Sequence, residues 1–515
     1  MKKCSLYFIA ILAAGLLGFA ACASTDIDTV ELSIAPKPSS YAGAEGEFEL
    51  TGSGRIVVAA GGSYDEVKQN VAEYLAKILR GSTGFDIKVA DDSEIPANGD
   101  IVLSLGSLGA PAESYVLKVE TDRITLTANE PAGLFRGVQT LRQLFGADIE
   151  RKSPVHDRKW AAACAEIKDS PVYQYRGLML DVARHFFPKE TVMRQIDHAA
   201  QYKINKLHLH LTDDQGWRIE IKSRPALTEI GSLGAVNGDP GGYFTQNDFI
   251  EIVEYAAARY IEVIPEIDMP GHVNAALVSI PELNPGGKPA KPRTDIEIGY
   301  STLQVHSEET YKFVDDVIRE LAAISPSKYF HIGGDEANAT ARNDYEYFIG
   351  RVSEIVKKYG KTTIGWSPYD SSEGVLTDAV VQNWLCNSGS FRSSNEKNLA
   401  VVLSPPGAYL DQKYNGSTKL GLQWRGLINL EKSYKWYPAV IAPKSRIFGV
   451  ESALWTETII TEDDIDYMLY PRLIANAEIG WTAGEERDFK NFKSRLPGQL
   501  ARLDMLGVKY SKRYN

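Results

Sequence analysis

Cysteine is scarce in this chain, which has four among 515 residues: Cys4, Cys22, Cys164 and Cys386. This number excludes a disulfide-stabilised scaffold, and no zinc-type spacing of cysteine and histidine occurs, so a structural metal is not expected. Stability must therefore come from a hydrophobic core. The composition allows one, because 44% of the residues are apolar, 10% aromatic and 24% charged, as in ordinary globular proteins.

The chain also has fewer basic than acidic residues. Lysine and arginine number 56 against 67 aspartates and glutamates, which gives a formal net charge of −11 at pH 7. A nucleic-acid partner would require a basic surface, so we exclude that class of function. At about 150 residues per domain, the length predicts about two to four domains.

The most apolar run, at the N-terminus, is too short to span a membrane. It extends without charge from Leu6 to Ala21, whereas a spanning helix needs about 20 residues, and it follows Lys2 and Lys3. This pattern is typical of an export signal. We therefore expect residues 1–21 to be a signal peptide and residues 22–33 to be a tether.

The end of this run carries a second signal. Phe-Ala-Ala-Cys at 19–22 is similar to a bacterial lipobox, although Phe19 departs from the small aliphatic residue usual there. We expect an exported lipoprotein, acylated at Cys22 and anchored in the periplasm or at the cell surface, with no other membrane contact. The alternative is simple secretion after cleavage at Ala21 or Ala23.

Residues 34–172 mix two kinds of periodicity, which predicts a smaller α+β accessory domain. Proline at position 171 suggests a boundary there, because the residue before a proline is pushed out of helix. The expected strands are Arg55–Ala59, Ile101–Leu105, Tyr115–Glu120 and Arg123–Thr127, and the expected helices are Tyr64–Arg80 and Pro131–Phe145.

Residues 173–515 alternate short apolar runs with longer amphipathic stretches. Eight such units predict a (β/α)8 TIM barrel, since these barrels run from about 200 to over 400 residues, and a doubly wound sheet is the alternative. The expected strands are Gly177–Ala183, Asn205–Leu211, Tyr260–Ile267, Tyr329–Gly333, Thr362–Trp366, Val380–Trp384, Ala400–Leu403 and Ile447–Leu454. The clearest helices are Lys189–Tyr202, Gln246–Arg259, Glu308–Ala323, Tyr345–Tyr359 and Asp463–Ala477.

Tryptophan and carboxylate side chains gather at the expected carboxyl ends of these strands, where barrel enzymes hold their active sites. Trp366, Trp384 and Trp455 each end a strand. Any one of them alone suggests core packing. Three together beside carboxylates favour sugar binding, because an indole face packs on the apolar face of a pyranose.

The sharpest local signal is Gly333-Gly334-Asp335-Glu336. A solvated acidic loop is the simplest interpretation, but the two glycines let a backbone turn tightly beside a ligand. Adjacent side chains point in opposite directions, so the pair cannot flank one bond at the usual 5 to 9 Å or so of glycosidase carboxylates. One of the two acids therefore needs a different role.

Two histidines raise a rival function. His208 and His210 share one face of a strand, as the zinc ligands of barrel amidohydrolases do. No histidine follows His331, so the later strands could offer a metal only carboxylates or Cys386. We favour the interpretation that these histidines orient carboxylates, and we expect no metal.

Long motifs follow the expected strands: Arg176-Gly-Leu-Met-Leu-Asp181-Val-Ala-Arg184-His185-Phe, His208-Leu-His-Leu-Thr-Asp213-Asp214-Gln-Gly-Trp217-Arg, Asp268-Met-Pro-Gly-His272, His331-Ile-Gly-Gly-Asp335-Glu336, Tyr409-Leu-Asp411 and Trp455-Thr-Glu457. Together they resemble glycoside hydrolase family 20, the β-N-acetylhexosaminidases. Gly133-Leu-Phe-Arg-Gly-Val-Gln-Thr-Leu141 resembles the accessory domain of that family. The resemblance covers nearly the whole chain after the signal and implies no cofactor.

The resemblance implies a role for each candidate residue. Glu336 would be the general acid and base, Asp335 would hold the 2-acetamido group of the substrate, and Tyr409 would bond its oxygen. Trp366, Trp384 and Trp455 would form the walls of the pocket. The resemblance further implies that Arg176, Asp411 and Glu457 bind sugar hydroxyls, and that His272 with Asp213 or Asp214 supports the acid.

The resemblance also implies a mechanism. The acetamido oxygen of the substrate would attack the anomeric carbon, so that a terminal β-linked N-acetylhexosamine leaves with retained configuration. Asp335 would then stay ionised, while Glu336 would alternate between acid and base. Two alternatives remain, a lacto-N-biosidase of the same family and a non-catalytic glycan-binding surface protein.

Overall fold

The computed structural model describes residues 33–91, 93–386 and 391–514. The expected signal peptide, Cys22 and all of the tether except Ser33 lie outside these ranges. No helix within them is long and apolar enough to cross a membrane.

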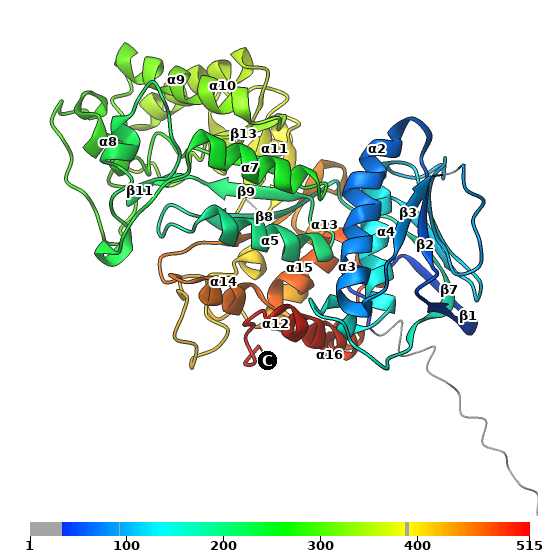
Figure 1. Cartoon of the computed structure of the whole chain (residues 1–515). Helices are drawn as coiled ribbons and strands as arrows, with labels where there is room; N and C mark the ends of the chain where they lie inside the picture. Colours follow the sequence, from blue (N-terminus) through cyan, green and yellow to red (C-terminus); the bar gives the residue numbers. More distant parts are fainter. Residues whose placement is uncertain (1–32, 92, 387–390, 515) are drawn as a thin grey trace, which may run out of the picture.

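The N-terminal region is a seven-stranded mixed sheet in the order β1-β7-β5-β6-β4-β2-β3. Helix α4 packs on strands β5 and β6, so α3 and α4 stand between the sheet and the rest of the chain (Figure 1). The strands are β1 (Ser40–Leu50), β2 (Arg55–Ala59), β3 (Lys88–Asp91), β4 (Ile101–Leu105), β5 (Tyr115–Val119), β6 (Ile124–Ala128) and β7 (Trp160–Asp169).

The helices of this region include both expected ones. The stretch Tyr64–Arg80 is not a single α-helix, because a π-helical turn, Lys68–Ala72, separates α2 (Tyr64–Val67) from α3 (Glu73–Thr83). Helix α4 (Pro131–Leu144) begins at a proline, which fits the first helical position because that residue has no hydrogen-bonded N–H there. Strands β1, β3 and β7 were not expected from the sequence.

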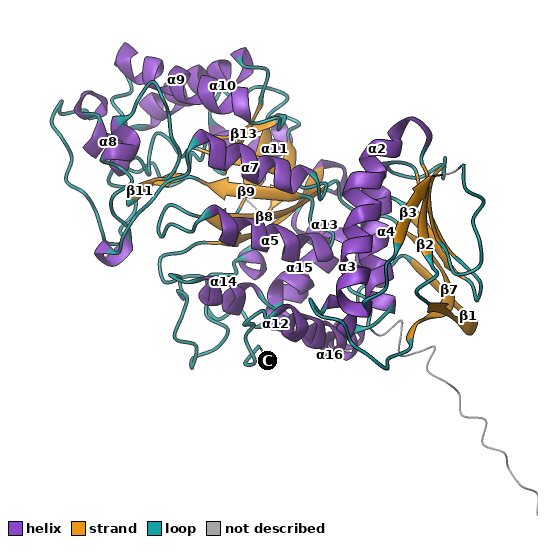
Figure 2. Cartoon of the chain, viewed as in Figure 1, coloured by secondary structure: helices purple, strands orange, loops and turns teal. Residues whose placement is uncertain are grey.

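The second region is a closed barrel of eight parallel strands with helices outside it (Figure 2). The last strand pairs with the first, Val450 lying beside Arg176, so the barrel interpretation is confirmed and the open, doubly wound sheet is wrong. The strands are β8 (Tyr175–Asp181), β9 (Lys206–His210), β12 (Glu262–Glu266), β13 (Tyr329–His331), β14 (Thr362–Trp366), β15 (Val380–Asn383), β16 (Ala400–Leu403) and β17 (Ile447–Leu454).

One expected helix of the barrel is two helices. Tyr470-Pro471 separates α14 (Glu462–Leu469) from α15 (Arg472–Trp481), because proline has no N–H to donate and clashes with the preceding turn. The other long helices are α5 (Lys189–Gln201), α7 (Gln246–Ala257), α9 (Glu308–Ile324), α10 (Arg342–Lys358) and α16 (Phe489–Leu506). Short elements are β10 (Thr212–Asp213), β11 (Gly216–Trp217), α6 (Ala226–Glu229), α8 (Asn274–Ser279), α11 (Arg392–Glu396), α12 (Leu430–Tyr434) and α13 (Pro438–Ile441).

Buried ion pairs join the accessory region to the amino end of the barrel. Glu113 contacts Arg136 at 2.7 Å and Arg176 at 2.6 Å, while Lys203 Nζ lies 2.8 Å from Asp169. All three cations are at most 1% exposed, so water reaches these contacts only from the side of Glu113, whose side chain is 15% exposed. The accessory region therefore leaves the carboxyl ends of the strands open.

Candidate active site

A cavity of about 410 Å³ opens at the carboxyl ends of the strands, a size suited to a small ligand. Most of the residues predicted for the site line it; Asp214, Asp411 and Arg176 do not. The lining residues are Arg184, Asp213, Asp268, His272, Ile296, Ile298, Asp335, Glu336, Trp366, Trp384, Tyr409, Leu422, Gln423, Trp424, Trp455 and Glu457.

The two adjacent acids follow strand β13 on a sharply turned backbone. Gly333 and Gly334 have φ values of 66° and 95°, and Glu336 itself adopts a φ of 45°. A Cβ at Gly333 would lie 1.8 Å from Asp268 Oδ1, so the close approach of the two segments requires glycine there. The turn leaves Asp335 buried at 9% exposure, whereas the Glu336 side chain is 27% exposed to the cavity.

Asp335 is a buried carboxylate that lacks a complete set of partners. Its Oδ1 is buried without a hydrogen-bond donor in the described part of the chain. Burial raises the pKa of Asp335 to about 6; His272 opposes this shift, and the charge of Glu336 adds to it. Asp335 is therefore mostly ionised at neutral pH and is ready to accept a hydrogen bond from a ligand.

Glu336 is supported by a histidine and a further carboxylate. His272 Nε2 lies 3.5 Å from Glu336 Oε2, and His272 Nδ1 lies 3.2 Å from Asp213 Oδ1. Burial alone would lower the pKa of His272, but Asp213 and neighbouring acids raise it well above its usual value. Asp214 lies farther from His272 Nδ1, at 4.0 Å, and accepts instead from Ser301. Asp213 is thus the carboxylate that holds His272.

Aromatic rings form the walls of the cavity. Trp366 is buried, and its Nε1 donates to Glu266 at 2.7 Å, while Trp384 Nε1 donates to the Ser367 carbonyl at 2.6 Å. Trp424, which the sequence analysis missed because it lies in a loop, is 49% exposed at the mouth of the cavity and meets Tyr409 edge to face at 5.1 Å.

Two further buried carboxylates, Asp411 and Glu457, lack a complete set of partners, and of the two only Glu457 lines the cavity. Asp411 Oδ1 and Glu457 Oε2 are buried with no hydrogen-bond donor from the described residues. Burial raises the pKa of Asp411 to about 8, and Glu457 adds to this shift. With its pKa raised in this way, the Asp411 carboxyl group is largely protonated at neutral pH and can both donate and accept hydrogen bonds.

Two family models match the chain, and together they cover most of it. The model described as Glycosyl hydrolase family 20, catalytic domain, matches residues 173–484. The model described as Glycosyl hydrolase family 20, domain 2, matches residues 31–170. The chain belongs to glycoside hydrolase family 20.

Similar proteins agree with this assignment. A beta-N-acetylhexosaminidase of Cellulomonas fimi is 40% identical over 409 residues, 78% of this chain and 81% of that protein. An N-acetyl-beta-hexosaminidase structure from Streptomyces plicatus, in complex with Thio-NAglucal, superposes with a TM-score of 0.89 at 42% identity, covering 94% and 97% of the two chains. An exo beta-N-acetylglucosaminidase structure from Vibrio harveyi superposes with a TM-score of 0.81 at 30% identity, covering 94% and 79%. The chain is a β-N-acetylhexosaminidase, and a purely glycan-binding role is set aside.

The structure corrects the sugar-binding role that the resemblance implied for one residue of this family 20 enzyme, Arg176. Arg176 lies at the start of β8, five residues or about 16 Å before the strand ends, and its guanidinium bonds Glu113 and the carbonyls of Tyr173 and Lys203. Arg176 cannot reach a sugar in the cavity. The arginine of the same motif that lines the cavity is Arg184.

Arg184 begins the loop after β8 and carries a well-supported guanidinium. Its Nη2 lies 2.8 Å from Asp213 Oδ2 and its Nη1 3.3 Å from Asp181 Oδ2. The guanidinium also packs over the ring of Trp455 at 4.8 Å. Strand position was the available signal, because Arg184 follows the strand end whereas Arg176 precedes it.

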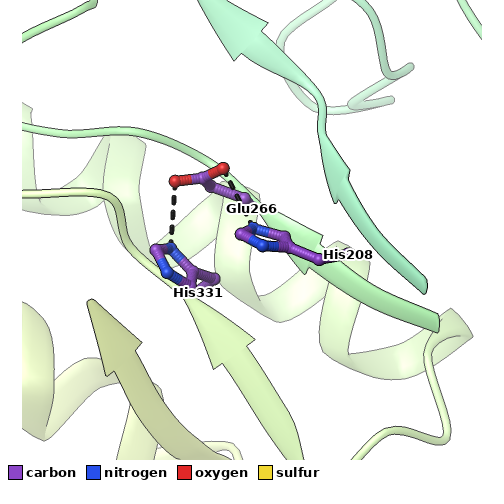
Figure 3. Close-up of side chains that lie close together, drawn as sticks. All are labelled: His208, Glu266 and His331. Carbon is purple, nitrogen blue, oxygen red and sulfur yellow. Dashed lines mark ion pairs between the residues drawn. The ribbon is translucent and has the colours of Figure 1, made fainter. Parts of the chain in front are cut away.

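The interior histidines of this family 20 enzyme surround one carboxylate (Figure 3). His331 Nδ1 and Trp366 Nε1 lie 3.0 and 2.7 Å from Glu266 Oε1, and His208 Nε2 and His210 Nδ1 lie 3.0 and 2.5 Å from Oε2. Each oxygen of Glu266 thus already has two nitrogen neighbours within 3.0 Å. This arrangement favours carboxylate orientation over the amidohydrolase interpretation.

Proposed function

We propose that the enzyme removes terminal β-linked N-acetylhexosamine, GlcNAc or GalNAc, from glycans by exo-acting, retaining, substrate-assisted catalysis. The observation that carries this proposal is the buried, unpartnered Oδ1 of Asp335 beside Glu336 in a cavity walled by tryptophan. A carboxylate in that position suits an amide N–H. Asp335 cannot act with Glu336 across one glycosidic bond, because the two residues are adjacent.

In the first step, the acetamido oxygen attacks the anomeric carbon and forms a cyclic oxazolinium ion. Asp335 accepts the N–H of the amide and stabilises the developing positive charge, and Tyr409 donates to the acetamido oxygen. Glu336 gives its proton to the departing glycosidic oxygen. In the second step, ionised Glu336 takes a proton from water while the water oxygen attacks the anomeric carbon. The bond from that carbon to the acetamido oxygen breaks, which opens the oxazolinium ring, restores the acetamido group and returns the β configuration.

Exo action is supported by the polar groups that would meet the far side of the sugar. Arg184 lines the cavity as a donor, and the free Oε2 of Glu457, which also lines it, suits a hydroxyl of a terminal residue. Trp424 with Ile296 and Ile298 would then contact the leaving sugar at the mouth. A panel of nitrophenyl glycosides of GlcNAc, GalNAc and lacto-N-biose separates this proposal from disaccharide release.

The nucleophile has its own test. If the acetamido group attacks, a β-glucoside with a free 2-hydroxyl should scarcely react, and a thiazoline mimic of the cyclic ion should bind far more tightly than substrate. A glucoside hydrolysed at a comparable rate would overturn the substrate-assisted step.

We also propose that the protein is exported and anchored to a membrane by a lipid on Cys22, which supports work on glycans outside the cytoplasm. The support is the sequence at 19–22, which lies outside the described residues. Cys22→Ala should release the protein from the membrane fraction. Unchanged partition would contradict the anchor, and secretion after Ala21 or Ala23 would then explain the signal.

A further inference from the structure

The contact between Asp213 and His272 continues inward, past the residues that line the cavity. His210 Nε2 lies 2.9 Å from Asp213 Oδ2, and His210 Nδ1 lies 2.5 Å from Glu266 Oε2. His210 and Glu266 are both fully buried in the barrel, and neither lines the cavity. Neither residue has a role in the mechanism proposed above.

The same pattern repeats on the other side of Glu266. His208 Nε2 lies 3.0 Å from Glu266 Oε2, and His208 Nδ1 lies 3.0 Å from Glu451 Oε1. Tyr175 and Gln382 donate to the two oxygens of Glu451 and end the series. A column of buried groups therefore runs from β17 across the barrel interior to Glu336.

Imidazoles and carboxylates alternate along this column. His208, His210 and His272 each have a carboxylate oxygen within 3.5 Å of both ring nitrogens, and two flanking negative charges favour the protonated, cationic imidazole. Burial lowers the pKa of His208, but Glu451 and Glu266 outweigh it and raise the pKa to about 9. Burial also lowers the pKa of His210. Glu266 and Asp213 outweigh burial and raise the pKa of His210 well above its usual value.

We propose that Glu266 and His210 are positioning residues for the acid Glu336, acting through Asp213 and His272 to set the pH at which Glu336 gives up its proton. The proposal rests on the proposed role of Glu336 as the acid. Charges in a buried column act over several contacts, because little water screens them.

The two residues should act in opposite directions. Glu266→Gln removes a negative charge from the column. His210 stays protonated, because Asp213 still faces its other nitrogen. The column therefore becomes more positive, and Glu336 should lose its proton more easily. His210→Gln removes a positive charge and leaves Asp213 and Glu266 less compensated, so Glu336 holds its proton to higher pH. A purely structural role has no reason to give shifts of opposite sign.

Other charged groups face this column and stay constant in the comparison. They are Asp335 beside Glu336, Arg184 beside Asp213, Asp181 near His210, His331 beside Glu266, Asp268 near His272 and His210, and Asp214 near His272. None of them is altered in the variants compared.

The test is the pH dependence of kcat/KM on an N-acetylglucosaminide with a poor leaving group, whose cleavage needs the protonated acid. The alkaline limb of the kcat/KM profile, where activity is lost as the pH rises, should move to lower pH by about half a unit in Glu266→Gln. It should move to higher pH by a similar amount in His210→Gln. Glu478→Gln is the matched control, because Glu478 is a fully buried, ion-paired carboxylate on α15 that does not line the cavity. It should lower stability and leave the limb in place.

Glu336→Gln separates this inference from the proposed function. If that variant keeps the alkaline limb, Glu336 is not the acid, and both proposals are overturned. A second outcome overturns only the present inference. In it, Glu336→Gln loses the alkaline limb of the pH profile, but Glu266→Gln and His210→Gln either leave that limb in place or both move it in the same direction. Should those variants not fold, Glu451→Gln decides the matter, with a smaller downward shift expected and an unmoved limb contradicting the column.

Discussion

The two ends of the barrel treat buried charge differently. At the amino end, Arg176 bonds Glu113 and two carbonyls, and Lys203 bonds Asp169 and Tyr115. These cations have their partners within the chain and fasten the accessory region to the barrel.

At the carboxyl end, three of the buried carboxylates predicted to meet the substrate keep an oxygen with no donor among the described residues: Asp335, Asp411 and Glu457. An unsatisfied buried polar group costs about 1–3 kcal/mol, more when it is charged, so such groups persist where a ligand completes them. Incomplete hydrogen bonding, more than charge itself, distinguishes the active end from the structural end.

The largest expected effect comes from replacing the unpartnered carboxylate of Asp335 at the carboxyl end of the barrel. Asp335→Asn presents an amide where the substrate needs an acceptor and removes the negative charge that favours the cyclic cation. We expect kcat to fall by about 10²- to 10³-fold with a smaller change in KM, because the interaction strengthens in the transition state. Steady-state kinetics on the nitrophenyl GlcNAc substrate measure this. A fall confined to KM would indicate simple binding.

The two arginines of one motif give the next effect. Arg184→Lys replaces a planar guanidinium, which contacts Asp181 and Asp213 through two nitrogens, by a single ammonium group at the cavity. We therefore expect kcat/KM to fall by about 10- to 100-fold. Arg176→Lys should lower the melting temperature and leave the activity of the folded enzyme unchanged, since Arg176 lies away from the cavity. Similar activity losses in both variants would break the distinction between the ends.

The pH dependence sharpens the comparison further. Because burial raises the pKa of Asp335 to about 6, kcat/KM should fall as the pH drops through about 6 and Asp335 takes up a proton. A folded-state pKa above the unfolded value also means that ionised Asp335 destabilises the fold, so Asp335→Asn should raise the melting temperature at neutral pH. The gain should shrink as the pH falls below about 6. A lowered melting temperature at neutral pH would show that Asp335 also holds the fold together.

The smallest expected effect is that of chelation. Glu266 already has two nitrogen neighbours at each oxygen, so activity should survive prolonged EDTA treatment. Loss of activity with recovery on adding zinc would revive the metal interpretation of His208 and His210.

The sequence predicted the barrel well because parallel strands buried on both faces appear as short, largely apolar runs, such as Ala400–Leu403. Strand β1 was missed because nearly all of its residues are exposed and glycine and glutamate interrupt its pattern. A π-helical turn and a proline divided two helices that amphipathic spacing alone predicts as continuous.

Some residues of the candidate site could be predicted from the sequence and others could not. Residues next to strand ends, such as Asp335, Glu336 and Trp366, could be placed from strand order alone. The resemblance implied Arg176, although the expected strand, Gly177–Ala183, begins after Arg176 and ends just before Arg184. The choice between Asp213 and Asp214 depends on about 1 Å of side-chain placement, which no sequence pattern contains.

The central claim is that the acetamido group of the substrate, and no protein carboxylate, attacks the anomeric carbon. Proton NMR of the first product formed from a β-N-acetylglucosaminide tests it most directly when combined with mass spectrometry of the enzyme during turnover. We expect the β anomer first and an enzyme of unchanged mass. A first-formed α anomer, or a glycosyl group trapped on any carboxylate, would contradict the mechanism.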